Sequence, residues 1–194
     1  MRFVNLNFVF LWNIKTVNMK KVLLFALAIV CYVSAFAQTR EIPRDKNTDQ
    51  IKFQQVIKVT GSQADIYKRL HDQWLNAAFK NPSSVIISDK DNVIEGKYTI
   101  YIDCNDAVKS KCPIVNYNFT VEARDGRLRY TITDLTLKNA RSLFPIERWL
   151  DKEDPQYDPA WSGYLDQIAE YVDQRAALLE EKVQPQRVIV EEDW

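Results

Sequence analysis

The feature that most constrains this fold is a pair of strand-like segments joined by Asp125-Gly126. Residues 114–124 alternate apolar and polar side chains with a period of two, the pattern of a strand with one buried face. A second strand is predicted over 127–137, directly after the turn. Because glycine tolerates the positive φ that a two-residue turn requires, Asp-Gly at this place predicts an antiparallel β-hairpin.

A two-residue turn also fixes which residues of the two strands face each other. We expect Arg124 opposite Arg127. The pairs that follow from this register match in character on both faces: Val121–Tyr130 and Phe119–Ile132 on one, Glu122–Arg129 and Thr120–Thr131 on the other. Matched cross-strand pairs stabilise a sheet, so the agreement supports both the hairpin and its register.

A further strand is predicted over residues 93–102, which carry an alternating apolar face. To bury that face beside the apolar face of 114–124, the numbers of paired residues must add to an odd number, as with Tyr98 opposite Phe119. Cys104 opposite Cys112 would give an even number. The cysteines are therefore expected beyond the regular ladder, where Pro113 lacks an N–H donor.

Two amphipathic helices accompany these strands. The first is predicted from a capping box at Ser62 and Asp65 to about Phe79. The second opens at Asp158-Pro159, with Asp as N-cap and Pro at the first helical position, and runs to about Val183. Their apolar stripes recur at helical spacing: Ile66, Leu70, Trp74 and Ala78 in the first, and Trp161, Leu165, Ile168, Val172, Ala176 and Leu179 in the second.

Shorter elements complete the chain. Strands are predicted over 51–60 and 84–88, a short helical turn within 141–150, and an acidic loop over 151–158. The order β-α-β-β-β-β-α, with one apolar face per strand, predicts an α+β fold: an antiparallel sheet of about five strands with both helices on one face. We expect a single domain over 51–183, between a flexible leader (38–50) and an acidic tail (184–194).

Three sequence features together resemble a known family. They are the opening strand with its Trp-bearing helix, Ile94-x-Gly96-Lys97 in the third strand, and Arg124-Asp125-Gly126-Arg127 followed by Tyr130. The family consists of exported bacterial proteins and is a domain of unknown function with a TBP-like fold. The likeness covers about residues 53–134. It implies a curved antiparallel sheet with both helices on one side, and it assigns no activity and no catalytic residues.

Residues 19–37 carry the pattern of a secretory signal peptide. Lys20 and Lys21 precede the apolar run 22–30, and Ala35-Phe36-Ala37 supplies small residues before a cut. We expect cleavage between Ala37 and Gln38, and a mature chain that is periplasmic or secreted.

Residues 1–18 precede a second start-like methionine, Met19. Asn5, Asn7, Asn13 and Lys15 interrupt their apolar run, so they make a poor membrane span, and we interpret them as an artefact of the assigned translation start. The alternative is an uncleaved membrane anchor built from both apolar runs. A lipid-modified Cys31 is disfavoured, because a small residue and not Val30 should precede it.

The charge of the mature chain limits the classes of partner that it can bind. Residues 1–37 hold four of the 26 basic residues and none of the 26 acidic ones, so the mature chain has 22 basic and 26 acidic residues, a formal charge of −4. A mildly acidic surface without a basic stripe argues against nucleic acid and against anionic lipid. An exported chain is also separated from ATP and nicotinamide cofactors, and we expect no cofactor.

Two cysteines remain after cleavage, Cys104 and Cys112. In an exported chain such a pair predicts a disulfide, which would stabilise the fold by about 2–3 kcal/mol through loop entropy. A metal site is disfavoured because the chain has one histidine and no second cysteine pair, and a redox role would favour closer spacing.

Candidates for catalysis are few. His71 is the only histidine and lies beside the apolar stripe of the first helix. We expect it to be an exposed helix residue without a catalytic role. Carboxylates that would suit hydrolysis or Ca²⁺ cluster in two loops, which hold Asp103 and Asp106, and Asp151, Glu153, Asp154 and Asp158. The second loop lacks the alternating pattern and glycine of a calcium loop, so solvated loops are expected.

The polar sheet face is the candidate binding site. Seven side chains on it form the predicted set: Tyr101, Thr99, Asn116, Asn118, Thr120, Arg129 and Thr131. Most other aromatic residues fall on apolar faces, where core packing explains them. A face that the helices leave open binds a partner or is simply solvated. We predict a non-enzymatic module for an envelope protein, peptide or glycan; the alternatives are a loop-carboxylate hydrolase and a lipid-carrying cavity protein.

Overall fold

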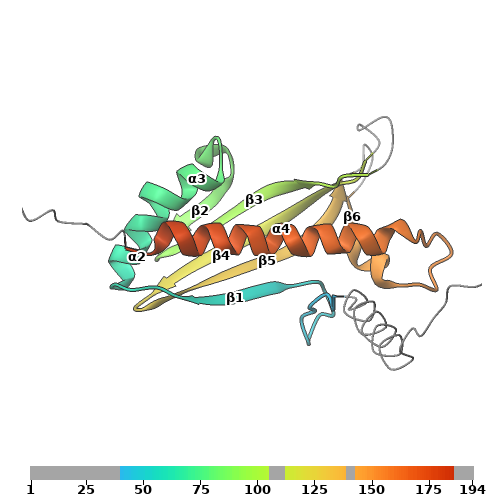
Figure 1. Ribbon diagram of the computed structural model, residues 1–194, viewed down its shortest axis with the longest axis horizontal. Helices are drawn as coiled ribbons and strands as arrows, with labels where there is room; N and C mark the ends of the chain where they lie inside the picture. The colour runs from blue at the N-terminus through green and yellow to red at the C-terminus, as the bar shows by residue number, and fades with distance from the viewer. Residues whose placement is uncertain (1–39, 105–111, 139–142, 186–194) are drawn as a thin grey trace, which may run out of the picture. The chain divides into compact units, whose positions relative to one another are not determined.

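The structure is a computed structural model that describes residues 40–104, 112–138 and 143–185 (Figure 1). The predicted signal peptide, the segment before it and residues 186–194 of the acidic tail lie outside these ranges. By their contacts, residues 42–194 cluster as one compact unit, apart from residues 1–41.

One antiparallel sheet organises this unit, with its strands in the order β1-β5-β4-β3-β2 and β6 paired with the end of β5 (Figure 1). The strands are β1 (Phe53–Lys58), β2 (Ile86–Lys90), β3 (Val93–Tyr101), β4 (Ile114–Arg124), β5 (Arg127–Lys138) and β6 (Leu143–Pro145). The predicted α+β class and antiparallel sheet are confirmed. The sequence misses β6, because three residues are too short a run to reveal a period of two.

The hairpin between β4 and β5 has the predicted register. Arg124 faces Arg127, and the four pairs expected from it all form. Gly126 has a φ of 71°, in the region that the turn needs and that glycine permits.

Further along β5 the pairing shifts by one residue. Asn118 faces Thr133, but Asn116 faces Thr136, so β5 holds one extra residue. This β-bulge includes Asp134, whose φ of 54° lies in the left-handed region that Asp tolerates better than most residues. Leu135, and not Asp134, is therefore the buried residue that follows Ile132.

The pairing of β3 with β4 confirms one expectation and corrects another. The paired numbers add to an odd number, but Tyr98 faces Tyr117, and Phe119 faces Gly96. The expected pair of Tyr98 with Phe119 is therefore wrong by two residues. A Cβ added to Gly96 would lie 2.5 Å from Phe119 Cε1 and 2.8 Å from the carbonyl oxygen of Val85. The bare glycine makes room for the Phe119 ring.

The first helix is built from α2 (Gln63–Arg69), a π-helical segment (Leu70–Leu75) and α3 (Asn76–Ala78). It begins with the predicted capping box: the Ser62 side chain accepts from the Asp65 N–H, and the Asp65 carboxylate accepts from the Ser62 N–H. The wide π turn was not predicted. The Asn76 side-chain amide donates to backbone carbonyls of that turn, 3.4 Å from the oxygens of His71 and Asp72.

The second helix is α4 (Ala160–Val183). Pro159 already has helical φ and ψ, and Asp158 Oδ1 accepts from the Ala160 N–H at 2.9 Å. Asp158 therefore performs the capping role predicted for it. Short 3₁₀ turns, Pro82–Ser84 and Ile146–Leu150, complete the helical segments.

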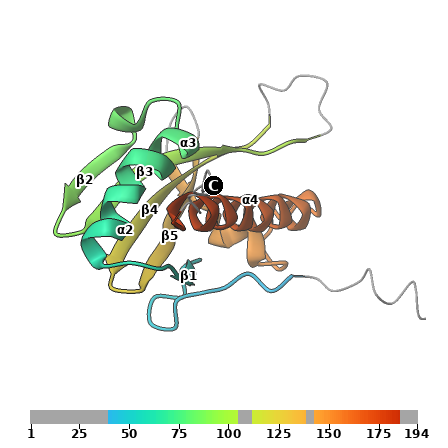
Figure 2. The same ribbon diagram turned by 60° about the vertical axis from the view of Figure 1, so that its left-hand side comes forward.

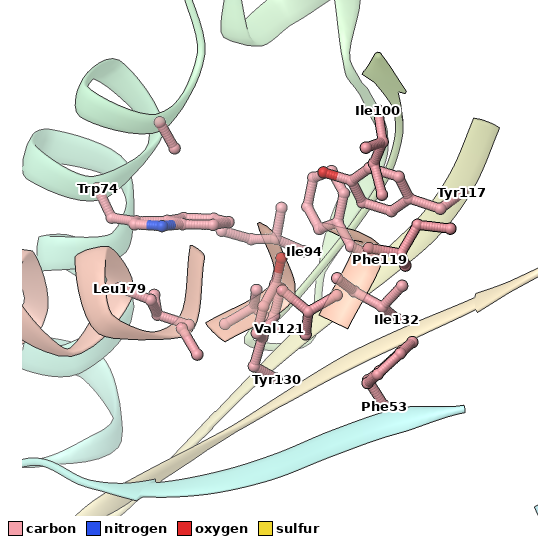
Figure 3. Packing of buried hydrophobic residues seen from close by; sticks show 14 of the residues in the cluster. Phe53, Trp74, Ile94, Ile100, Tyr117, Phe119, Val121, Tyr130, Ile132 and Leu179 are labelled. Atoms are coloured by element: carbon pink, nitrogen blue, oxygen red, sulfur yellow. The ribbon is translucent and has the colours of Figure 1, made fainter. Parts of the chain in front are cut away.

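Both helices pack against the apolar face of the sheet, where the core lies (Figures 2 and 3). Trp74 is fully buried and its ring makes edge contacts with Phe79, Phe119 and Tyr130. The inward residues of β4 are buried as the alternation predicts: Val115, Tyr117, Phe119, Val121 and Ala123. The described residues contain no helix that is long and apolar enough to cross a membrane.

The predicted disulfide joins Cys104 to Cys112. It lies beyond Tyr101 and Ile114, the last pair of the β3–β4 ladder, as expected from the pairing argument.

The predicted leader (38–50) ends in a turn before β1. In this turn the Asp45 carboxylate accepts from the Asn47 N–H at 3.0 Å and pairs with Lys52 Nζ at 3.0 Å. The leader thus meets β1 through a hydrogen-bonded turn.

Candidate functional site

The outer face of the sheet is the candidate site. Because the helices of the described unit pack on the apolar side, this face presents polar side chains to solvent. The seven predicted residues all project from it, and two of their pairs are direct neighbours: Thr99 faces Asn116, and Thr120 faces Thr131. Tyr101, at one end, is 76% exposed.

The predicted residues do not form a single pocket. Tyr101 pairs with Ile114 and Arg129 pairs with Glu122, so the set extends over eight residue steps of β4. At the usual strand rise this is about 27 Å. A face of that length suits an extended ligand better than a small molecule, because a small ligand would touch only part of the set.

A hollow of about 490 Å³ occupies the middle of the face, beside the bulge. Its lining contains three predicted residues and others that the sequence did not indicate: Thr99, Asn116 and Asn118, then Lys97, Tyr98, Tyr117, Asp134 and Thr136. Bulges re-aim side chains at sheet surfaces, and this one brings a carboxylate into a lining that otherwise holds neutral donors and acceptors and Lys97. One sequence signal would have located the bulge: the apolar residue that follows Ile132 is Leu135, three positions later, where regular alternation would need two.

Hydrogen bonds hold the side chains of the hollow in place. Asp134 Oδ2 accepts from Asn118 Nδ2 at 2.7 Å and from Thr133 Oγ1 at 3.0 Å. Thr99 Oγ1 donates to Asn116 Oδ1 at 3.1 Å. Among the described residues, no further hydrogen bond to Asp134 Oδ1, to the side-chain oxygen of Asn118 or from the Asn116 NH₂ group is present.

The hairpin end of the face is charged. Glu122 pairs with Arg129 and with Arg124, whose Nη2 lies 2.6 Å from Glu122 Oε1. Hydrogen bonds from Arg129 first, then from Arg124, lower the pKa of Glu122 below its ordinary value of 4.5. Since Arg129 is already engaged by Glu122, it offers less to a ligand than the sequence suggests.

The histidine lies at a different place. His71 Nε2 is 3.3 Å from Asp89 Oδ1, and the Tyr67 hydroxyl donates to the same carboxylate. Burial, followed by the hydrogen bond to Asp89, raises the pKa of Tyr67 to about 12. This group ties α2 and the π turn to β2. No serine or cysteine contact to His71 is present in the described residues, so the chemistry of a catalytic triad gains no support.

The acidic loop is occupied by its own contacts. Asp151 Oδ1 accepts from the Glu153 N–H at 2.9 Å, and Asp154 Oδ1 accepts from the Gln156 N–H at 2.8 Å. The latter bond, together with Arg148, lowers the pKa of Asp154. Asp106 lies outside the described residues. Within the described ranges, no three His, Cys, Asp or Glu side chains are placed to hold a metal ion.

One polar network on the covered side was missed by sequence analysis. Arg175 Nε donates to the Tyr171 hydroxyl at 2.9 Å, and Arg175 Nη1 donates to the Ala78 carbonyl at 2.6 Å. The Tyr171 and Tyr117 hydroxyls are 3.0 Å apart, and burial raises the pKa of Tyr117. The network joins α4, α3 and β4, so it is placed to align the helices on the sheet.

Residues 53–138 match a family described as a domain of unknown function (DUF4468) with TBP-like fold. The matched segment belongs to the DUF4468 family. The match confirms the family that the sequence resembles and covers β1 to β5, which hold the whole candidate site.

Solved structures support the same fold for this DUF4468 domain. A TBP-like protein from Parabacteroides distasonis ATCC 8503 superposes with a TM-score of 0.59 at 11% identity, over 73% of this chain and 96% of that chain. A DUF4468 family protein from Bacteroides ovatus ATCC 8483 gives a TM-score of 0.54 at 18% identity, over 77% and 95%. At these identities the likeness shows the fold alone. No curated protein matches the chain.

Proposed function

We propose that the mature chain is an exported, non-enzymatic binding module that holds a glycan strand along the outer face of its sheet. The observation that carries this proposal is the uncovered polar face with its hollow at the Asp134 bulge. The signal-peptide pattern and the Cys104–Cys112 disulfide support export, because disulfides persist in oxidising compartments.

The chemistry of the face favours a hydroxyl-rich ligand. Threonine hydroxyls both donate and accept, and each asparagine amide offers two donors and an acceptor. Sugar hydroxyls have the same dual character, so they can pair with Asn116, Asn118 and Asp134 without bringing charge. Tyr101 provides an exposed ring at the end of the face, on which a sugar can stack.

The face suits a peptide or protein less well. Protein interfaces draw most of their energy from several Trp, Tyr and Arg anchors, and here one exposed ring, Tyr101, stands at the end of the face while Arg129 is held by Glu122. Peptides that add to sheets bind at an edge, where backbone groups are free. In the middle of this face, those groups are consumed by the β3–β4–β5 ladders.

Binding of the mature chain to a panel of envelope polysaccharides, glycan fragments and peptides tests the proposal. We expect capture of a glycan, and at least a tenfold loss of affinity in the variant Tyr101→Ala/Asn116→Ala/Asn118→Ala. The matched control is Glu170→Ala/Gln174→Ala on α4, whose side chains hydrogen-bond to each other. It should bind as the unmodified chain does, and circular dichroism verifies that both variants fold.

Other outcomes would contradict the proposal in distinct ways. Undiminished capture by the triple variant would remove the site, and capture of peptides alone would change the ligand class. Cleavage of a glycan, measured with and without EDTA, would favour the hydrolase alternative. Lipid found by native mass spectrometry would favour the cavity alternative.

A further inference from the structure

The hairpin end of the outer face carries a row of cations across three neighbouring strands. Lys58 of β1 faces Arg127 of β5, and Arg127 faces Arg124 of β4. Arg129 follows Arg127 on the same face. Strands are about 4.8 Å apart, so the row spans roughly 10 Å. All four side chains are exposed, and we call them the basic row.

The positive charge of the basic row is only partly neutralised. Glu122 holds Arg124 and Arg129, and Asp125 in the turn accepts from the Gln63 N–H. Neither Lys58 Nζ nor the Arg127 guanidinium meets a carboxylate within the described residues. Beside the row, a hollow of about 210 Å³ exposes Val56, whose exposed fraction is 60%.

The end of α4 lies beside the backbone of β1, the edge strand that carries Lys58. The Gln184 side chain, directly after α4, donates from Nε2 to the Lys58 carbonyl oxygen at 2.8 Å. Figure 1 shows the same arrangement: the C-terminal end of α4 lies at the end of the sheet where β1 meets α2. The chain therefore continues beyond Pro185 from a point beside Lys58.

The sequence that continues there has the complementary charge. Residues 186–194 read QRVIVEEDW, with an apolar run at 188–190 and three consecutive acids at 191–193. Glu191 lies seven positions after Gln184, a reach of up to about 24 Å in extended chain. That reach exceeds the width of the basic row and leaves length for the chain to pass around the edge strand β1 to the outer face.

We infer that residues 186–194 dock on the basic row, with the acids at 191–193 paired to Lys58 and Arg127 and the apolar run beside Val56. The occupant is this chain's own segment, which starts beside the backbone of Lys58 at the edge strand β1 and stays at high effective concentration because it is tethered. The docked segment covers Arg129, so it narrows the outer face to the hollow and Tyr101. This inference does not depend on the identity of the ligand bound there.

Zero-length carbodiimide crosslinking of the full mature chain tests this inference. The reagent joins an amine to a carboxylate only when the two are in contact. We expect a bond between Lys58 and one of Glu191, Glu192 or Asp193. The contact of Lys52 with Asp45, at 3.0 Å, is the internal positive control.

Variants test whether charge holds the segment. Arg127→Glu should lower the yield of the Lys58 crosslink at least fivefold, and Arg127→Glu combined with Glu192→Arg should restore it. Lys152→Glu, in the loop before α4, is the matched control and should leave the yield unchanged. Absence of the Lys58 crosslink while Lys52–Asp45 forms, or a yield insensitive to Arg127→Glu, would overturn the inference. In a mixture of ¹⁴N and ¹⁵N chains, a mixed-isotope crosslink would assign the segment to a second copy and overturn it equally.

Discussion

The two faces of β4 show how differently one strand can be constrained on its two sides. Inward, Phe119 is buried against Trp74, stacks on Phe79 and uses the space left by Gly96. Outward, Thr120 lies between Glu95 and Thr131 with solvent above it. The inner face is fixed by volume, whereas the outer face is fixed only by hydrogen bonds and charge. Substitutions on the inner face should therefore cost stability, and those on the outer face should cost binding.

The largest difference is expected between neighbours on the two faces. Phe119→Ala should lower the free energy of unfolding by about 3–5 kcal/mol, because it removes a buried ring and leaves a cavity. Thr120→Ala should change it by less than about 0.5 kcal/mol. Urea denaturation of both variants measures the contrast. Similar losses for the two would show that the faces are not distinct.

Gly96→Ala tests the inner face by adding volume. A Cβ there meets the Phe119 ring and the Val85 carbonyl, so we expect a loss of about 1–3 kcal/mol. The matched control is Glu95→Ala, one residue earlier and exposed, which should remain within about 0.5 kcal/mol. Thermal and urea unfolding check both values. A neutral Gly96→Ala would mean that the Phe119 ring can move aside.

Asp134 tests whether the outer face contributes any stability of its own. Asp134→Ala should cost about 1–2 kcal/mol, since it removes two hydrogen bonds and keeps a positive φ that alanine disfavours. Asp134→Asn should cost less than about 0.5 kcal/mol, because asparagine tolerates this φ and its carbonyl can accept the same bonds. Equal effects of the two changes would contradict this account of the bulge.

The smallest effect concerns pH. The folded pKa of Glu122 lies below 4.5, so its ion pairs stabilise the fold above that pH, and the contribution is lost as pH falls through the lower folded value. Glu122→Gln should therefore be less stable than the unmodified chain at pH 6 by under about 1 kcal/mol. The difference should fade on acidification, as measured by urea unfolding across the series. A difference that is independent of pH would point to packing instead of charge.

The features that the sequence predicted correctly are those set by residues close together in the chain. The turn at Asp125-Gly126 and the alternation after it determined the β4–β5 register as far as Asn118 and Thr133. The capping box determined the start of α2, and the pair of cysteines in a chain with an export signal predicted the disulfide. These features are local, so few residues suffice to specify them.

What the sequence did not reveal depends on contacts between distant segments. The pairing of Phe119 with Gly96 follows from how a ring fits a neighbouring strand, which alternation cannot show. Arg175 reads as a polar residue beside a helix stripe until its partners Tyr171 and Ala78 are in place. For the candidate site, the sequence placed seven residues on the outer face, but not their spread along it, nor the Glu122 pairing that occupies Arg129.

The bulge in β5 has a consequence for how this surface can change over generations. If Asp134 were excised, Leu135 would come to face Tyr117, while Thr136 and Leu137 would keep their partners Asn116 and Val115. The pairing of β5 with β4 would become regular, and every apolar side chain would stay in the interior. Burial of the core therefore does not constrain the residue at position 134. Evolution can insert, delete or replace it according to what the outer face binds.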